Sequence, residues 1–188
     1  MKGRTHVKCI YLVRHCAATG QGSECALTER GIIQARELTE FFQQIPLNRI
    51  ITSPYKRAID SCKGIAKEKS IHIESDCRLI ERILCKQAIP DWREKLYQSF
   101  CNRDVKLAGG ESSNEAATRG CAVIEEVLTD EFNHTLIVTH GNLLTLLLNH
   151  FDQSYGYETW MQLTNPDVYR LTFNNNELDI QRIWKVLH

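Results

Sequence analysis

Runs of strand length and runs of helix length alternate along almost the whole chain, and this alternation most constrains the fold. Residues 7–13 are rich in β-branched and aromatic side chains, as strands are. Residues 29–44 carry apolar side chains at helical spacing, and Pro46 ends that run. An alternating order of this kind predicts an α/β fold, namely a three-layer α/β/α sandwich with a mostly parallel central sheet. The remaining segments of the pattern are strands 49–52, 71–74 and 135–139, and helices 53–68, 112–129 and 142–150.

The helix over 53–68 is expected to begin at Ser53-Pro54, since Ser is a favoured N-cap and Pro a favoured first helical residue. Between residues 77 and 111 the pattern weakens. We expect loops and a helix over 91–101 there, forming a small cap over the active site. The last two strands, 168–173 and 178–184, flank Asn174-Asn175-Asn176, which predicts a hairpin at the sheet edge. No repeat or long polar linker divides the chain, so residues 1–188 are expected to form a single domain.

Charge and apolar runs exclude several classes of protein. Lysine and arginine total 23, aspartate and glutamate also total 23, and this balance argues against nucleic acid as a partner. The apolar runs at 9–13 and 143–148 are too short for a signal-peptide core or a membrane span, so we expect a cytoplasmic protein with no membrane partner. The 8 cysteines are scattered without a C-x-x-C pair, which favours reduced thiols over disulfides or a zinc site. The oligomeric state stays open.

Three predicted strands deliver polar residues to one edge of the sheet. The first strand ends in Arg14-His15, the second leads to Arg57 one turn into its helix, and the strand over 135–139 ends in His140-Gly141. The carboxyl ends of parallel strands form the usual ligand site of such sheets. Two guanidinium groups, together with the backbone N–H groups of helix starts, match a phosphate group. A neutral imidazole beside them can attack phosphorus.

Six segments, in this order along the chain, resemble the motifs of the histidine phosphatase superfamily, the phosphoglycerate-mutase-like proteins. Each motif is weak alone, but their order and their placement on the expected elements are specific. The first resembles the family's L-V-R-H-G and the last its V-T-H-G. The segments are Leu12–His15, Leu27–Gly31 followed by Gln34-Ala35, Thr52–Pro54 with Arg57-Ala58, Leu79–Glu81, Gly110–Ser112 and Val138–Gly141.

The resemblance implies a metal-independent phosphate-monoester hydrolase that needs no cofactor and acts on a small phosphorylated metabolite. His15 would form a phosphohistidine, and Arg14, Arg57 and His140 would hold the phosphoryl oxygens. Glu81 would protonate the leaving oxygen and then activate the water. A phosphoglycerate mutase is the alternative, but mutases of this family carry longer caps, and the short segment here favours water access and hydrolysis. A non-catalytic phosphate-binding relative is the third possibility.

The loop after the nucleophile departs from the family. Cys16 stands where the family usually has Gly, and two interpretations follow: the thiol simply fits, or the nearby arginines lower its pKa and make the enzyme sensitive to oxidation. The family's next phosphate donors are also missing, and Thr19 or Gln21 is the candidate replacement. The residues after Glu81 do not match either, so the natural substrate stays open.

Overall fold

A six-stranded sheet forms the centre of the molecule. The structure is a computed structural model that describes residues 7–175 and 177–184. The strand order is β3-β2-β4-β1-β5-β6; β3, β2, β4 and β1 run parallel, and β5 and β6 are antiparallel additions. The predicted edge hairpin is thus confirmed, although Asn176 in its turn lies outside the described residues. The strands are β1 (Val7–Arg14), β2 (Arg49–Thr52), β3 (Ile73–Ser75), β4 (His134–Thr139), β5 (Asp167–Asn174) and β6 (Glu177–Arg182).

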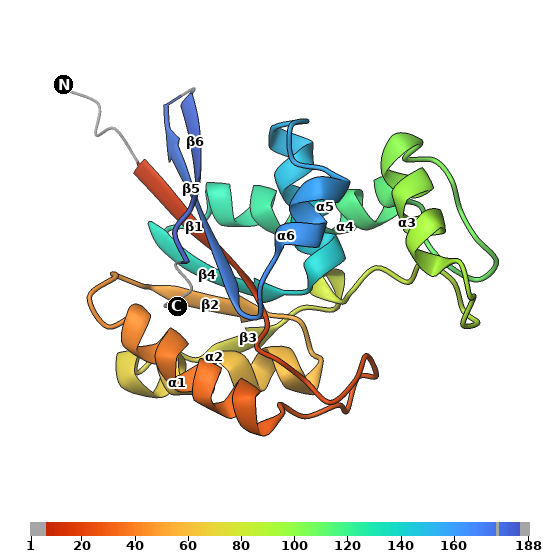
Figure 1. Ribbon diagram of the computed structural model, residues 1–188. Helices are drawn as coiled ribbons and strands as arrows, with labels where there is room; N and C mark the ends of the chain where they lie inside the picture. Colours follow the sequence, from red (N-terminus) through yellow and green to blue (C-terminus); the bar gives the residue numbers. More distant parts are fainter. Residues whose placement is uncertain (1–6, 176, 185–188) are drawn as a thin grey trace.

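Helices cover both faces of this sheet, so the predicted three-layer α/β/α sandwich is confirmed. Figure 1 shows α1 and α2 below the sheet, and α4, α5 and α6 above it. No helix in the described part of the chain is long and apolar enough to cross a membrane. The helices are α1 (Glu29–Phe41), α2 (Lys56–Lys69), α3 (Trp92–Cys101), α4 (Ser113–Thr129), α5 (Gly141–Phe151) and α6 (Tyr157–Gln162).

The alternation of side chains along β1 explains why two helical layers form. Ile10 and Leu12 belong to the core between the sheet and α4 and α5, whereas Tyr11 and Val13 belong to the core between the sheet and α1 and α2. Successive side chains of a strand point to opposite faces, so a central strand with an unbroken apolar run over residues 9–13 needs cover on both sides. All four of these side chains are at most 5% exposed.

Two predicted helix boundaries were wrong. Helix α2 begins at Lys56 with Tyr55 as N-cap, three residues later than Ser53. The reason is that the Ser53 N–H donates to the Val138 carbonyl (2.9 Å), which extends the β2–β4 pairing beyond the strand. Helix α1 ends at Phe41, ahead of the predicted residue 44, and the short helix α6 was not predicted.

Residues 77–111 leave the sheet and return to it. They begin with a 3-10 turn, η1 (Cys77–Leu79), and contain α3, which Figure 1 places at the side of the molecule, away from the strands. Arg82 anchors this segment, because its buried guanidinium donates to the hydroxyls of Ser99 (2.7 Å) and Ser113 (2.9 Å). The segment is therefore tied to the start of α4.

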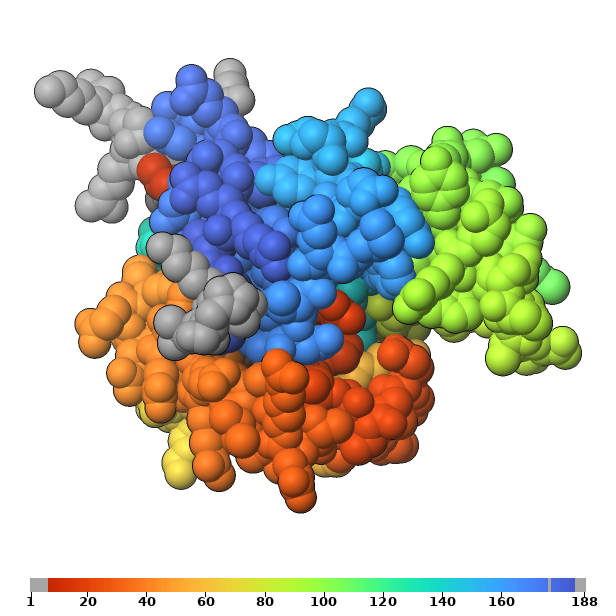
Figure 2. All heavy atoms as spheres, in the orientation of Figure 1, coloured from red at the N-terminus to blue at the C-terminus, as the bar shows by residue number. Residues whose placement is uncertain are grey.

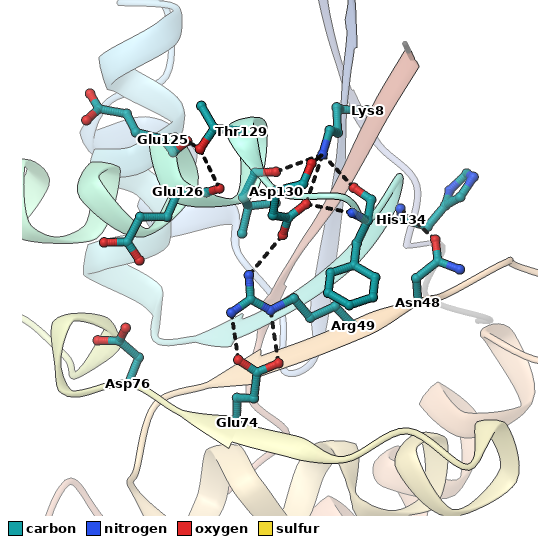
Figure 3. A network of polar contacts seen from close by, with 12 residues as sticks. Lys8, Asn48, Arg49, Glu74, Asp76, Glu125, Glu126, Thr129, Asp130 and His134 are labelled. Atoms are coloured by element: carbon teal, nitrogen blue, oxygen red, sulfur yellow. Dashed lines mark hydrogen bonds and ion pairs between the residues drawn. The ribbon is translucent and has the colours of Figure 1, made fainter.

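A polar network fixes the amino ends of the parallel strands (Figure 3). Lys8 Nζ donates to the Asp130 carboxylate (2.9 Å), to the Val127 carbonyl in α4, and to the Asp130 and Phe132 carbonyls in the turn between α4 and β4. Arg49 joins Asp130 to Glu74, with a bidentate contact to the Glu74 carboxylate at 2.9 and 2.6 Å. These contacts tie β1, β2, β3 and the α4–β4 turn together at this end, which leaves the carboxyl ends of the strands for the site.

Candidate functional site

The carboxyl ends of β1, β2 and β4 bring His15, Arg57 and His140 together. In the parallel register Arg14 pairs with Thr139 and Thr52 with Val138, so the residue after each strand emerges at the same edge. The His15 N–H donates to the Thr139 carbonyl (3.0 Å), which carries the β1–β4 pairing one residue beyond the strand. The register of three strands, rather than any local motif, therefore makes the site.

The guanidinium group of Arg57 connects the parts of this site. The side chain is fully buried, and its Nε donates to His15 Nε2 (3.1 Å) while its Nη2 donates to His140 Nδ1 (3.1 Å). Its Nη1 donates to the carbonyls of Gln21 (3.0 Å) and Gly22 (2.7 Å). One cation thus holds both histidines and the loop after β1.

The hydrogen bonds of His15 fix which nitrogen is free to react. Nδ1 lies 2.7 Å from the Cys16 carbonyl, which can only accept, so Nδ1 carries the proton and Nε2 carries the lone pair. Burial, helped by the positive charges of Arg57 and Arg14, lowers the pKa of His15 to about 3. The imidazole is therefore neutral at physiological pH, with Nε2 available as a nucleophile.

We expect a reaction at His15 Nε2 to show no acidic limb from His15 near pH 6.5. Because the folded-state pKa is about 3, the imidazole stays neutral as the pH falls through its ordinary value of 6.5. The same shift lowers the free energy of unfolding in acid. Below about pH 6.5, His15 binds a proton in the unfolded chain but stays neutral in the folded chain. The measurement is kcat/KM from pH 4 to 8, corrected for ionisation of the substrate phosphate, with circular dichroism confirming the fold at each pH. This assignment would be contradicted if activity fell in an acidic limb near pH 6.5 and NMR showed the His15 imidazole gaining a proton over the same pH range.

His140 is held by two residues that the sequence did not single out for this purpose. Its Nδ1 accepts from Arg57, so its Nε2 donates to the Ser53 hydroxyl (2.8 Å). The Tyr55 ring packs edge-on against the imidazole, with ring centroids 5.1 Å apart, and also lies 4.9 Å from the Arg57 guanidinium carbon. The sequence placed Ser53 in a motif and as a helix cap but gave its hydroxyl no partner; its place just after β2 was the signal that it faces the site. Burial lowers the pKa of His140 well below its ordinary value, so this imidazole is neutral too.

Arg14 offers an unused donor to the site. Its Nη1 donates to the carbonyls of Leu163 (3.1 Å) and Thr164 (3.4 Å), whereas its buried Nε has no partner among the described residues. Gly141 makes this arrangement possible, because a Cβ there would lie 3.1 Å from Arg14 Nε. Gly141 is also the first residue of α5, where helix geometry leaves backbone N–H groups without intrahelical partners.

Glu81 reaches the same place from the segment after η1. Its carboxylate accepts the N–H groups of Asn142 (3.0 Å) and Leu143 (3.0 Å), the second and third residues of α5. Its charge acts on Arg14 and Arg57 and opposes the fall in pKa that burial causes in both. The structure therefore gathers Arg14, His15, Arg57, Glu81, His140 and Gly141 in one site.

The loop candidates are placed differently. Thr19 is exposed, and its hydroxyl donates to the Ala26 carbonyl (3.3 Å), so it is directed along the loop. Gln21 has an exposed side chain and contributes its carbonyl to Arg57. The structure thus brings the backbone of Gln21, but not the hydroxyl of Thr19, to the buried site residues.

The expectation that nearby arginines lower the pKa of the Cys16 thiol was wrong. The Cys16 side chain is fully buried, together with Ala58 and Cys62, in the core between the sheet and helices α1 and α2. Burial raises the pKa of the thiol to about 11. The residue simply fits, because its side chain points into the core instead of crowding the phosphate site.

Two buried polar side chains hold the loop after His15, and neither was assigned this role from the sequence. Ser61 Oγ accepts from the Cys16 N–H (2.9 Å), and Gln34 Oε1 accepts from the Ala17 N–H (2.8 Å). The Asn165 side-chain amide donates to the His15 carbonyl (2.6 Å). Figure 2 shows the surface hollowed between this orange-red loop and the blue segment that contains α6. The site is therefore rigid at its base and open on one side.

This arrangement can bind and transfer a phosphoryl group. It joins a neutral nucleophilic nitrogen to two guanidinium groups, a second imidazole and the start of a helix, and it places a carboxylate at their edge. Within the described residues, no group of three or more His, Cys, Asp or Glu could hold a metal ion.

Comparisons with known proteins agree with this geometry. The model of the histidine phosphatase superfamily (branch 1) matches residues 10–185. A probable phosphoglycerate mutase GpmB of Proteus mirabilis is 28% identical over 186 residues, covering 89% of this chain and 86% of that protein. Two solved structures share the fold: a mycobacterial glucosyl-3-phosphoglycerate phosphatase (TM-score 0.75, 19% identity, 94% of this chain and 97% of that one) and a phosphoglycerate mutase of Bacillus anthracis (TM-score 0.76, 19% identity, 95% and 93%).

Proposed function

The chain belongs to the histidine phosphatase superfamily, and from that premise we propose that it is a metal-independent phosphate-monoester hydrolase that works through a phosphohistidine on His15. The observation that carries the proposal is the protonation of His15, whose Nδ1–H is bound to the Cys16 carbonyl while Nε2 keeps its lone pair. Members of the family act as phosphatases or mutases, so an enzyme of this kind is established by membership.

In the first step His15 Nε2 attacks phosphorus. Arg57 Nε, which donates to that nitrogen in the free site, moves to a phosphoryl oxygen as the lone pair is used. The unpartnered Arg14 Nε, the Gly141 N–H and the His140 Nε2–H, which leaves the Ser53 hydroxyl, bind the other oxygens. The bond from phosphorus to the alcohol oxygen breaks, and the Glu81 carboxyl group gives that oxygen its proton.

In the second step water attacks the phosphohistidine. The Glu81 carboxylate takes a proton from the water, the phosphorus–nitrogen bond breaks, and His15 regains its neutral form. The open side of the site next to the β1 loop admits the water. We propose that residues 77–111 form the cap that covers the substrate and that the protein works in the cytoplasm. The substrate is a small phosphorylated metabolite.

Phosphoglycerate mutase is the second candidate, favoured by the names of the Proteus and Bacillus proteins. The decisive experiment incubates the protein with chelator and 3-phosphoglycerate, with and without a bisphosphoglycerate primer. Release of inorganic phosphate from a panel of monoesters, with conversion to 2-phosphoglycerate at less than about one-tenth of that rate, is the expected result. Primer-dependent isomerisation faster than phosphate release would make the protein a mutase. Turnover that chelator stops would contradict the metal-free mechanism.

A further inference from the structure

Glu81 lies on backbone that has no regular secondary structure, so its position must be fixed by other contacts. Residues 80–83 follow the η1 turn and lie outside helix and strand. On one side of Glu81, Arg119 Nη1 donates to the carbonyls of Arg78 (2.6 Å) and Ile80 (2.9 Å). On the other side, the Ile83 N–H donates to the Glu111 carboxylate (3.3 Å). The two residues that hold this backbone are thus Arg119 and Glu111.

Arg119 and Glu111 are locked to each other. Arg119 Nε donates to Glu111 Oε1 (2.8 Å) and Nη2 to Oε2 (2.9 Å), a bidentate pair whose side chains are 18% and 25% exposed. Although burial opposes it, the hydrogen bonds and charge of Arg119 hold the pKa of Glu111 below its ordinary value. A planar guanidinium that makes two parallel bonds to a carboxylate has a fixed orientation, so the remaining Nη1 is aimed at the carbonyls beside Glu81.

Arg82 adds a second hold directly after Glu81. Its Nε and Nη2 donate to the Glu111 carbonyl (3.1 and 3.0 Å), while its Nη1 reaches the two serines of α3 and α4. Glu111 therefore contacts this segment through its carboxylate and its backbone. The backbone on both sides of Glu81 is tied to the start of α4.

Helix α4 packs closely against α5, the helix whose first N–H groups donate to the Glu81 carboxylate. Gly120, the residue after Arg119, faces α5, and a Cβ there would lie 2.8 Å from the Leu147 side chain. Arg119 on α4 and the Asn142 and Leu143 N–H groups on α5 are thus parts of one helix pair. The pair holds Glu81 at its backbone and at its carboxylate.

We propose that Arg119, oriented by Glu111, is a positioning residue for proton transfer by Glu81. This inference rests on the proposed function, in which Glu81 protonates the leaving alcohol. A carboxyl displaced by about 1 Å transfers its proton poorly, and such displacements cost on the order of a hundredfold in rate. Arg119 does not itself touch the substrate.

The test is the dependence of kcat/KM on the leaving group. This constant reports the steps up to departure of the alcohol. Dinitrophenyl phosphate has a leaving group that needs no proton, whereas phenyl phosphate has one that does. We expect Arg119→Lys to lower kcat/KM for phenyl phosphate by about 10- to 100-fold and to leave dinitrophenyl phosphate within about twofold. A general loss of folding would lower both equally, so the ratio separates positioning from stability.

Three further variants make the result decisive. Glu81→Gln should show the same leaving-group effect, and Glu81→Gln with Arg119→Lys should add nothing to it, because residues that act as one unit are not additive. Arg49→Lys is the matched control, since Arg49 makes an equivalent bidentate pair with Glu74 at the far end of the sheet (Figure 3) and should leave the ratio unchanged. A leaving-group effect in Glu81→Gln but not in Arg119→Lys would overturn the positioning role. No effect in Glu81→Gln would overturn the proposed function of Glu81 itself, and the inference with it.

Discussion

Replacement of His15 by alanine is expected to lower kcat by at least about 10⁴-fold, as loss of a covalent nucleophile does in other enzymes. The other imidazole of the described site, His140, is fully buried; its Nδ1 accepts from Arg57 Nη2, and its Nε2 carries a proton bound to Ser53. Alanine also leaves Arg57 Nε without its acceptor. We therefore do not expect His140, which is fully buried, to replace His15 as the nucleophile.

The measurement is hydrolysis of para-nitrophenyl phosphate with chelator present, together with trapping of the intermediate after mixing with radiolabelled substrate. Wild-type protein should carry a label that is stable in base and lost in acid, as expected of a phosphohistidine, and His15→Ala should carry none. His72→Ala is the matched control, because His72 is exposed and makes no side-chain hydrogen bond to a described residue. A labelled His15→Ala protein, or one with wild-type turnover, would show that another residue is the nucleophile.

Replacement of Arg57 by lysine is expected to lower kcat/KM by about 10²- to 10³-fold, the usual cost of losing a transition-state donor. The charge is kept, but an ammonium group cannot present donors in the directions of His15, His140 and the loop carbonyls at once. Gln21 and Gly22 lose the guanidinium N–H donors that hold their carbonyls, so the loop after β1 loosens as well.

Two measurements separate these effects. In Arg57→Lys, inorganic phosphate should inhibit more weakly, in parallel with the fall in kcat/KM, because the bound anion contacts the same guanidinium. The looser loop should lower the temperature of thermal unfolding. Arg49→Lys serves as control, since Arg49 lies at the opposite end of the sheet and its loss should affect stability alone. If Arg57→Lys kept its affinity for phosphate, Arg57 would be an organiser of the histidines and not a phosphate ligand.

The layers of the fold could be predicted because they follow from local patterns. The spacing of apolar side chains along the sequence distinguishes strands from helices. It predicts β1, β4, α4 and α5 with small errors at their ends. The errors arose where a tertiary contact outweighed a local preference. Ser53 is a good N-cap by type, but Val138 recruits its N–H into the sheet and His140 donates to its hydroxyl.

Residue identity and order at strand ends could also nominate Arg14, His15, Arg57 and His140. They could not show which nitrogen of His15 is free, because that depends on the Cys16 carbonyl and on the buried Arg57. The sequence likewise suggested a thiol of low pKa at Cys16, because it showed the two nearby arginines but could not show that the side chain is buried.

The sequence by itself thus determined the α/β architecture and the chemical groups delivered to one edge of the sheet, since both depend on side-chain type and spacing along the chain. The tertiary structure alone decided the protonation of the two histidines, the burial and raised pKa of the Cys16 thiol, and the contacts of Arg119 and Glu111 with the backbone around Glu81. Those properties come from desolvation and from hydrogen bonds between residues far apart in sequence, and such contacts exist only once the strands and helices have packed.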